Sequence, residues 1–433
     1  MSFDETNLVP NAGLLPAAVL AQRLDLAGLV DRRLRLARHG ANSGAKAMSV
    51  IGSMLVGGDS IDDVAVLRAG AASALFDGTR APSTVGSWLR SHKWSNARQL
   101  DAVSRELLAR LWAAGAGPAD LAGPLTIDLD STIVPVHGRA KQGAAFGYTK
   151  VRGYHPQLAT CAQTGQVLMS RLRGGAAGAA RGASSFLTET VSRVRGAGAT
   201  GQLTVRADSA FYSKAVLATA AKFGVRFSIT ARQDKRVRAA IEKIDQDAWQ
   251  PIPYWLSTPE VSGADIAETA FTVFAGDKRH ARQVRLVVRR VRPTPGSQLA
   301  LFTTWDYHAF VTDRDLPVTE VEADHRRHAI VEQSIAELKS AGLAHLPSGK
   351  FTANAAWLAL TVMAHNLGRA VGQLAGADLH QATAATLRRK VFTMPGRLVH
   401  TGRRRHLRLP ANWPWADPVR LALTRITAIP LRC

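Results

Sequence analysis

The sequence predicts an α/β protein in which an all-α segment precedes a mixed sheet covered by helices. Residues 14 to about 117 show helical periodicity with short connections. Strand-like apolar runs then appear at 125–130, at about 154–162 and at 166–173. Helical and strand patterns alternate from there to residue 230, which is typical of a mixed α/β sheet.

The N-terminal segment is predicted to contain five helices, at 15–37, 45–58, 60–70, 82–92 and 96–114. The helices at 60–70 and 82–92 could form a helix-turn-helix that reads DNA. Helices this short are more often ordinary bundle elements, so both interpretations stay open. A stretch rich in Gly, Ala and Pro at 115–124 predicts the linker to the next part.

The remaining elements complete the predicted α/β part and an insertion within it. Alternating helices and strands are expected at 184–195, 203–207, 213–223 and 225–230, and helices return at about 324–341 and 352–374. Between them, 232–308 is predicted to be a mostly β insertion. The predicted parts are therefore 1–117, the split domain 118–231 and 309–375, the insertion 232–308, and a basic C-terminal segment, 376–433.

The composition favours a phosphate-rich partner. The 433-residue chain has 55 Lys and Arg against 33 Asp and Glu, a formal net charge of +22. Such an excess favours nucleic acid through counterion release and long-range steering. The two cysteines are too few for a disulfide framework or a zinc cluster. The N-terminus has no basic region followed by an apolar stretch, and the apolar helix around 355–364 is short, so we expect a cytoplasmic, nucleoid-associated protein without membrane contact.

Three acidic residues stand out in this basic chain. Asp130 ends the strand-like run in LTIDLDST, Asp208 follows the run in LTVRADSAFYS, and Glu332 lies within a helical pattern. Asp128 points to the same face as Asp130, because side chains alternate along a strand, so either could be the first ligand. Taken singly, each Asp could instead cap a turn or the helix at 213–223.

Glu332 shares its predicted helix face with other polar residues. A period of 3.6 residues places three side chains in one stripe with it: His325, His328 and Lys339. The adjacent apolar stripe, expected to pack on the sheet, consists of Val331, Ile335 and Leu338. A solvated face of mixed charge is the alternative interpretation.

The surroundings of Asp130 favour a metal site next to nucleic acid. Residues 131–188 contain no acid, but they contain seven cations: Arg139, Lys141, Lys150, Arg152, Arg171, Arg173 and Arg181. Carboxylates ringed by cations suit Mg²⁺ (or Mn²⁺) together with DNA phosphates. Two such ions about 3.5–4 Å apart support in-line displacement at phosphorus without a side-chain nucleophile. The sequence has no P-loop, nucleophile elbow, supported Cys–His pair or HExxH motif.

These motifs, together with the C-terminal RKVFTMPGRLVHTGRRRHLRLPANWPW, resemble the DDE transposases of bacterial insertion sequences, in particular insertion-sequence family 1380. The resemblance covers most of the chain. It implies a ribonuclease-H-like fold with a β insertion between the second and third acids. It also implies that Asp130, Asp208 and Glu332 form the metal-binding catalytic triad, with Asp128 as a second choice for the first position.

The resemblance also implies DNA contacts. Lys339 is expected to contact transposon-end DNA. Further contacts are expected from basic residues near the acids and in the tail: Arg139, Lys141, Arg326, Arg327, Arg403, Arg404 and Arg405. Related transposases carry a Tyr and an Arg seven and four positions before the catalytic Glu, where this chain has His325 and His328. The roles of these two histidines are therefore open.

The expected function is a transposase that binds the inverted repeats of its element, cuts at their ends and joins the 3′-hydroxyls to target DNA. Because transposition pairs two ends, a homodimer is expected on double-stranded DNA. One alternative is a catalytically inactive DNA-binding repressor derived from a transposase. Another is a nuclease of the same fold without joining activity.

Overall fold

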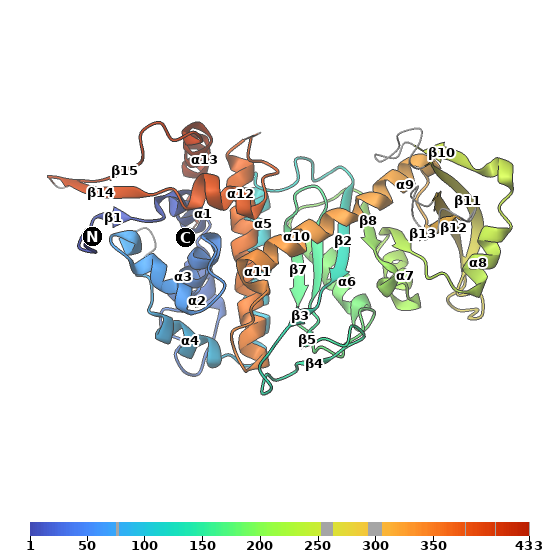
Figure 1. The fold of residues 1–433 in the computed structure, drawn as a ribbon, viewed down its shortest axis with the longest axis horizontal. Coiled ribbons are helices and arrows are strands. Elements are labelled where there is room, and N and C mark those ends of the chain that lie inside the picture. The colour runs from blue at the N-terminus through green and yellow to red at the C-terminus, as the bar shows by residue number, and fades with distance from the viewer. Residues whose placement is uncertain (75–77, 253–262, 293–304, 377, 403, 433) are drawn as a thin grey trace.

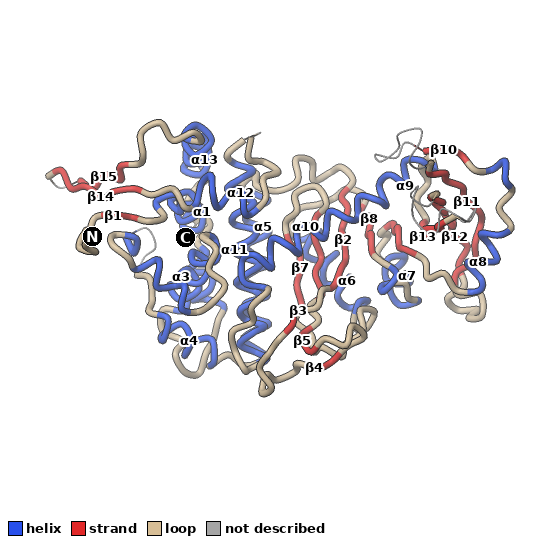
Figure 2. Tube along the Cα trace, viewed as in Figure 1, coloured by secondary structure: helices blue, strands red, loops and turns tan. Residues whose placement is uncertain are grey.

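The computed structural model describes residues 1–74, 78–252, 263–292, 305–376, 378–402 and 404–432. Both chain ends lie in a helical part, and a long sheet extends from that part to the opposite end of the molecule (Figure 1). Figure 2 shows the same division, with helices gathered on one side and strands continuing across the other. The predicted DNA contact Arg403 lies outside the described residues.

The helical part forms around α11, Phe351–Leu374, which is buried along nearly its whole length. A helix that is apolar on all sides needs partners on all sides. Its partners include α1 (Leu15–Arg23), α3 (Ser43–Leu55), α4 (Pro82–Arg90), α5 (Trp94–Ala113) and α13 (Ala416–Ala428). The helix α2, Leu26–Arg33, packs on α3 and α5. The predicted helices 15–37, 45–58, 82–92 and 96–114 are thereby confirmed, the first of them divided into α1 and α2.

The predicted helix at 60–70 is a 3-10 helix, Asp62–Arg68. Residues 69–81 separate it from α4, whereas a helix-turn-helix joins its helices by a turn of about three or four residues. The helix-turn-helix interpretation was therefore wrong, and α4 packs as an element of the bundle.

A mixed sheet forms the rest of the fold. Within the described residues it has nine strands in the order β10–β11–β12–β13–β9–β8–β2–β6–β7. From one edge to the other these are Gln250–Ile252, Ala264–Val273, Arg282–Val291, Asp306–Thr312, Arg226–Thr230, Leu203–Ala207, Leu125–Ser131, Gln157–Cys161 and Val167–Arg171. Strands β2, β8 and β9 are parallel, and the remaining pairs are antiparallel. The mixed α/β fold class is confirmed.

A helix precedes the second strand of each parallel pair, and the chain between β2 and β8 also contains the β6–β7 hairpin. The helix α6, Ala183–Gly196, precedes β8, and α7, Lys214–Lys222, lies between β8 and β9. Ser213 caps α7 by accepting from the N–H of Val216. Strands β10, β11 and β12, which the sequence assigns to the insertion, continue the same sheet beyond β13. The helix α8, Lys235–Glu242, also belongs to this stretch.

The predicted strand at 154–162 is divided. Arg152–Tyr154 is β5, which joins β3 (Val134–Pro135) and β4 (Ala145–Phe146) in a small separate sheet, whereas β6 begins at Gln157. Pro156 stands between the two strands and has no N–H for a ladder hydrogen bond, which favours an interruption there.

The C-terminal segment packs against the N-terminal part of the chain. It contains α12 (Ala384–Leu387), β14 (Gly396–Thr401), β15 (Arg404–Arg408) and α13. Strand β14 pairs with the N-terminal β1, Leu8–Val9, and α13 packs on α1. Beyond β1, the β14–β15 hairpin projects away from the body (Figure 1).

Within the described ranges, no single helix has the length and apolar character needed to cross a membrane. One bent helix pair, 12–23 with 26–33, passes the test on length and composition alone.

Candidate active site

Asp130 and Asp208 lie side by side at the end of two neighbouring parallel strands. The register between β2 and β8 pairs Leu129 with Ala207, so the next residue on each strand is an aspartate. Because β2 and β8 are parallel, their carboxyl ends meet at the same edge of the sheet. Both side chains are partly exposed there.

Each aspartate also makes a local hydrogen bond through one carboxylate oxygen. Oδ1 of Asp130 accepts from the N–H of Ser131 at 2.6 Å, and Oδ1 of Asp208 accepts from the N–H of Ala210 at 3.0 Å. Asp208 thereby caps the short 3-10 turn Ser209–Phe211, whereas the following helix is capped by Ser213. The local capping role and a metal-binding role are compatible, because each cap hydrogen bond uses only Oδ1.

Glu332 reaches the same region from a helix. It is an exposed residue of α10, Ile330–Leu338, and α10 lies against β2 (Figure 1). Burial, as the largest cause, and the charges of Asp208 and Glu332 together raise the pKa of Asp130 to about 6, against the opposing effects of the Ser131 N–H and His328. Burial also raises the pKa of Asp208. The structure therefore brings all three predicted acids into one electrostatic neighbourhood.

Asp128 is fully buried and engaged elsewhere. Its Oδ1 accepts from Nε of Arg206 at 2.8 Å, and its Oδ2 accepts from Nη2 of the same guanidinium at 2.7 Å. The register of β2 and β8 places these two residues directly opposite each other. Nδ1 of His328 lies 2.8 Å from Oδ1 of Asp128. Because both oxygens serve a buried ion pair, the contacts favour Asp130 as the first ligand.

The ion pair of Asp128 extends to the helix before α10. Nη1 of Arg206 donates to Oδ1 of Asp324 at 3.0 Å and to the carbonyl oxygen of the same residue, and Asp324 is also paired with Arg314. Asp324 belongs to α9, Val318–Arg326. Arg206 therefore connects β2, β8 and the helical segment that leads to Glu332.

The predicted helix at about 324–341 is present, but it is not one regular α-helix. The chain makes α9, a 3-10 turn Arg327–Ala329, α10 and a π-helical turn Lys339–Leu343. A 3-10 turn winds more tightly than an α-helix and changes which side chains lie in line. His325, in the last turn of α9, contacts β9, whereas His328, within the 3-10 turn, contacts β2. The apolar stripe was predicted correctly: Val331, Ile335 and Leu338 are buried.

His325 has a packing role. Its ring stacks on Phe310 at a centroid distance of 4.0 Å, and its two nitrogens lie 2.8 Å from the Ser228 hydroxyl and 3.2 Å from the Thr230 hydroxyl. Burial, as the largest cause, and the charges of His328, Arg206 and Arg289 together lower its pKa to about 3. A neutral, stacked His325 cannot serve as a cationic phosphate contact near pH 7.

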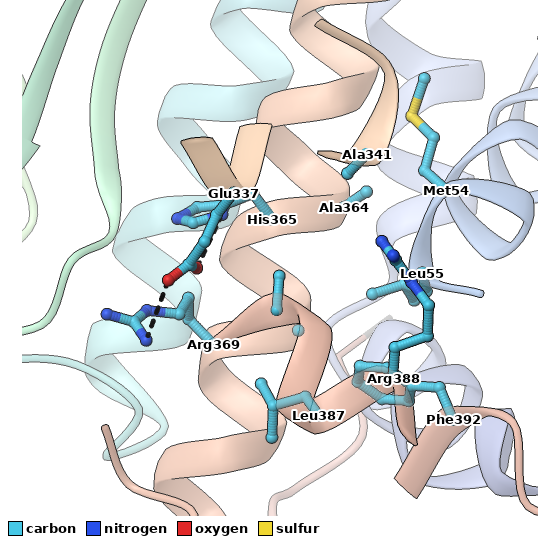
Figure 3. Close-up of a pocket in the computed structure, with 12 residues that line it drawn as sticks. Met54, Leu55, Glu337, Ala341, Ala364, His365, Arg369, Leu387, Arg388 and Phe392 are labelled. Atoms are coloured by element: carbon cyan, nitrogen blue, oxygen red, sulfur yellow. Dashed lines mark ion pairs between the residues drawn. The ribbon is translucent and has the colours of Figure 1, made fainter. Parts of the chain in front are cut away.

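The helix that carries Glu332 is anchored at its other end by a buried carboxylate (Figure 3). Glu337 lies 3.8 Å from His365 and 4.0 Å from Arg369, both on α11. His365 and Arg369 in turn contact the carbonyls of Gly165 and Thr164 in the turn between β6 and β7. Glu337, His365 and Arg369 line part of a small, mostly apolar pocket, which the three acids of the candidate site do not line.

A family model described as transposase DDE domain, group 1, matches residues 1–431 of this chain. The chain belongs to this DDE transposase family. No curated protein matches it. Among solved structures, it is similar to a piggyBac transposase in a synaptic complex with hairpin DNA, at 11% identity and a TM-score of 0.40, over 89% of this chain and 80% of that one.

The side chains predicted to contact DNA in this transposase differ in their exposure to solvent and in their existing partners. The exposed ones are Arg139, Arg327, Arg404 and Arg405. Lys141 donates to the carbonyl of Leu346, and burial lowers its pKa. Arg326 is paired with Glu322 at 3.1 Å. Lys339 is half-buried at the start of the π-helical turn.

Sequence reasoning missed two buried residues beside the acids. Arg206 was read as part of an apolar strand, although an Arg within the run Leu203–Ala207 requires a buried partner. His155 was also missed; its Nε2 lies 2.9 Å from the Ser131 hydroxyl, next to Asp130. The signal for Arg206 was its charge in a buried strand, but its partner could be found only from the parallel register.

Members of a DDE family generally use divalent metals. Throughout the ranges that the structure describes, no group of three or more His, Cys, Asp or Glu side chains is gathered closely enough to hold a metal ion as it stands. The donor set nevertheless fits such an ion, because carboxylate oxygens are the ligands that Mg²⁺ prefers. The mutual charge of the three acids, seen in the raised pKa of Asp130, is what a cation would relieve.

Proposed function

We propose that this transposase binds the inverted repeats of an insertion sequence, cuts DNA at their ends and joins the ends to target DNA. The observation that carries the proposal is the strand register that places Asp130 beside Asp208, together with the packing of α10, which carries Glu332, against β2. These three residues would hold two Mg²⁺ or Mn²⁺ ions. Bound there, the ions would stabilise the charge that develops on the attacking and leaving oxygens at phosphorus.

The proposed reaction has two displacements at phosphorus. In the first, a water oxygen bonds to phosphorus at the element end, the bond from phosphorus to the 3′ oxygen breaks, and a 3′-hydroxyl and a 5′-phosphate result. In the second, that 3′-hydroxyl attacks a target phosphodiester, loses its proton and releases the 3′-hydroxyl of the target strand. The role of the protein side chains is to fix the acids: the strand register places Asp130 and Asp208, and the contacts of α9 and α10 place Glu332.

We further propose a ribonuclease-H-like catalytic domain of the kind found in insertion-sequence family 1380. Three antiparallel strands, β7, β6 and β2, followed by the parallel β8 and β9 with intervening helices, support this assignment. The strands from β10 to β12 would then be the insertion between the second and third acids.

The β14–β15 hairpin is the proposed duplex-binding element of the C-terminal segment. Arg404 and Arg405 are exposed on a ribbon that projects from the body (Figure 1), a shape that can follow a DNA groove. Lys339, Arg139 and Arg327 would add contacts nearer the acids. Two protomers would pair the two ends of the element.

Replacing Arg404 and Arg405 together by Ala should weaken DNA binding and flatten its salt dependence. Each lost phosphate contact removes about 0.9 from the slope of log K against log salt concentration, so the double variant should lose about 1.8. Fluorescence anisotropy with a labelled DNA duplex at several KCl concentrations measures this slope. Arg420→Ala is the matched control, because Arg420 is 75% exposed on α13 and already paired with Asp417. An unchanged slope in the double variant would remove the hairpin from the DNA-binding surface.

The function itself is tested by incubating the protein with Mg²⁺, a target plasmid and a DNA fragment that carries the ends of its element. The proposal predicts both 3′-hydroxyl ends and joined products. Cleavage without joining would identify a nuclease of the same fold. Binding without cleavage under Mg²⁺ or Mn²⁺ would identify a repressor derived from a transposase.

A further inference from the structure

A pocket opens beside Asp208. Its volume is about 270 Å³, and it is lined by Ser131, Tyr148, Gly178, Ala179, Ala180, Arg181, Asp208, Ala210 and Arg232. This volume lies just below the roughly 300–1,000 Å³ of sites for drug-sized ligands, so the pocket suits one nucleotide better than a larger group. Its place beside one of the candidate metal ligands makes its occupant relevant to the reaction.

One wall of the pocket is formed by the backbone of a loop that buried side chains hold in place. The loop at 174–182 consists of Gly and Ala apart from Arg181, so no bulky side chain fills the space in front of Gly178 and Ala179. Its carbonyls face the protein: that of Gly178 accepts from Nη1 of Arg173 at 2.9 Å, and that of Ala179 accepts from Nε2 of Gln157 at 2.7 Å. Both of these supporting side chains are buried. These hydrogen bonds fix the conformation of the loop, and the loop places no bulky side chain in the pocket apart from Arg181.

Buried His155 completes the support behind this wall. Its Nδ1 lies 2.6 Å from the carbonyl of Ala177, and its Nε2 lies 2.9 Å from the hydroxyl of Ser131, which lines the pocket. The loop and the end of β2 are thus joined through one imidazole. This connection ties the shape of the pocket to the strand that carries Asp130.

The other groups at the pocket are an aromatic ring and two cations. Tyr148 is 79% exposed, and its ring centroid lies 5.9 Å from that of His155. Arg181 and Arg232 are exposed, and Nε of Arg232 donates to the carbonyl of Ser209 at 3.2 Å, which holds this guanidinium beside Asp208. An exposed ring and two cations at one pocket match the parts of a nucleotide, because the base can stack on the ring and the phosphates can contact the cations.

We propose that this pocket binds one nucleotide of a single-stranded DNA segment next to the phosphodiester that is cut. The base stacks on Tyr148, and the flanking phosphates contact Arg181 and Arg232. The inference rests on the proposed function, because it is the position of Asp208 in that function that relates the pocket to the cut. In this proposal the DNA strand separates from its duplex at the active site. Any base can occupy the pocket, because every base can stack on an aromatic ring.

The test compares two labelled strands by fluorescence anisotropy without divalent metal. One is a 20-nucleotide oligothymidylate, and the other is a strand of equal length made of abasic units. The wild-type protein should prefer the oligothymidylate, and Tyr148→Ala should reduce that preference by about tenfold, within the range for one stacked base. Tyr148→Phe should retain the preference, because its ring still stacks. Arg181→Ala and Arg232→Ala should weaken both strands equally, because phosphate contacts do not depend on the base.

Matched controls separate the pocket from general loss of charge or aromatic surface. Phe146→Ala removes a ring that is 67% exposed on the nearby β4, and Arg236→Ala removes an exposed cation of α8; neither should change binding of either strand. A Tyr148→Ala protein that keeps the full preference for oligothymidylate would overturn the proposal. Because no cleavage is needed, the pocket can fail while the transposase reaction stands, and the reaction can fail while the pocket stands.

Discussion

Replacing Asp208 by Asn should reduce DNA strand cleavage by at least about 10²–10³-fold, the loss expected when a group that stabilises transition-state charge is removed. The substitution keeps the shape of the side chain, and the Asn oxygen can still accept from the N–H of Ala210. The cap of the turn after β8 therefore survives, while the negative charge needed for a divalent cation is lost. Asp130→Asn and Glu332→Gln should give losses of the same order.

These losses should occur without loss of DNA binding, which anisotropy with a labelled duplex measures in parallel with a gel assay of cleavage. Asp234→Asn is the matched control: Asp234 caps α8 through the N–H groups of Arg236 and Val237, and it lies outside the candidate site. It should cleave like the wild type. If any one of the three acid variants cleaves at the wild-type rate, that residue is not a member of the triad.

Replacing Arg206 by Met should destabilise the protein by about 3–5 kcal/mol, the cost of leaving a buried charge without its partner. Asp128 has no exposed surface and depends on this guanidinium for two hydrogen bonds. The same change also removes the contacts to Asp324 that hold α9 to the sheet. Urea denaturation followed by circular dichroism gives the free energy of unfolding.

Arg226→Met on the adjacent β9 is the control, since the guanidinium of Arg226 is about half exposed and lies 3.8 Å from Asp313. Exposed pairs of this kind contribute about 0–1 kcal/mol. Changing Asp128 to Leu in the Arg206→Met background should recover part of the lost stability, because no uncompensated charge then remains in the core. Equal destabilisation by the Arg206 and Arg226 variants would contradict the structural role given to the buried pair.

The sequence predicted best where a pattern is local. The run Leu203–Ala207 forms β8 with the bounds expected of it, and the buried faces of Val331, Ile335 and Leu338 follow from helical periodicity. The positions of Asp130 and Asp208 at strand ends were also predictable, because apolar runs stop directly before them. Such features depend on residues within a few positions of each other.

Features that depend on distant partners were not predictable. Which of Asp128 and Asp130 faces the candidate site is decided by Arg206, which lies opposite Asp128 only once β2 and β8 are paired. The contacts of His325 with β9 and of His328 with β2 also form only in the folded chain. The pairing of β14 with β1 joins the two ends of the chain.

The central claim, that Asp130, Asp208 and Glu332 form one metal site, is tested most directly by a crystal structure of the DNA-bound protein with Mn²⁺, measured at the Mn absorption edge. Two anomalous peaks are expected about 3.5–4 Å apart, bounded by the carboxylates of these three residues. Asp128 should remain paired with Arg206. Mn²⁺ bound by Asp128 in place of Asp130, or bound away from Asp208 and Glu332, would contradict it.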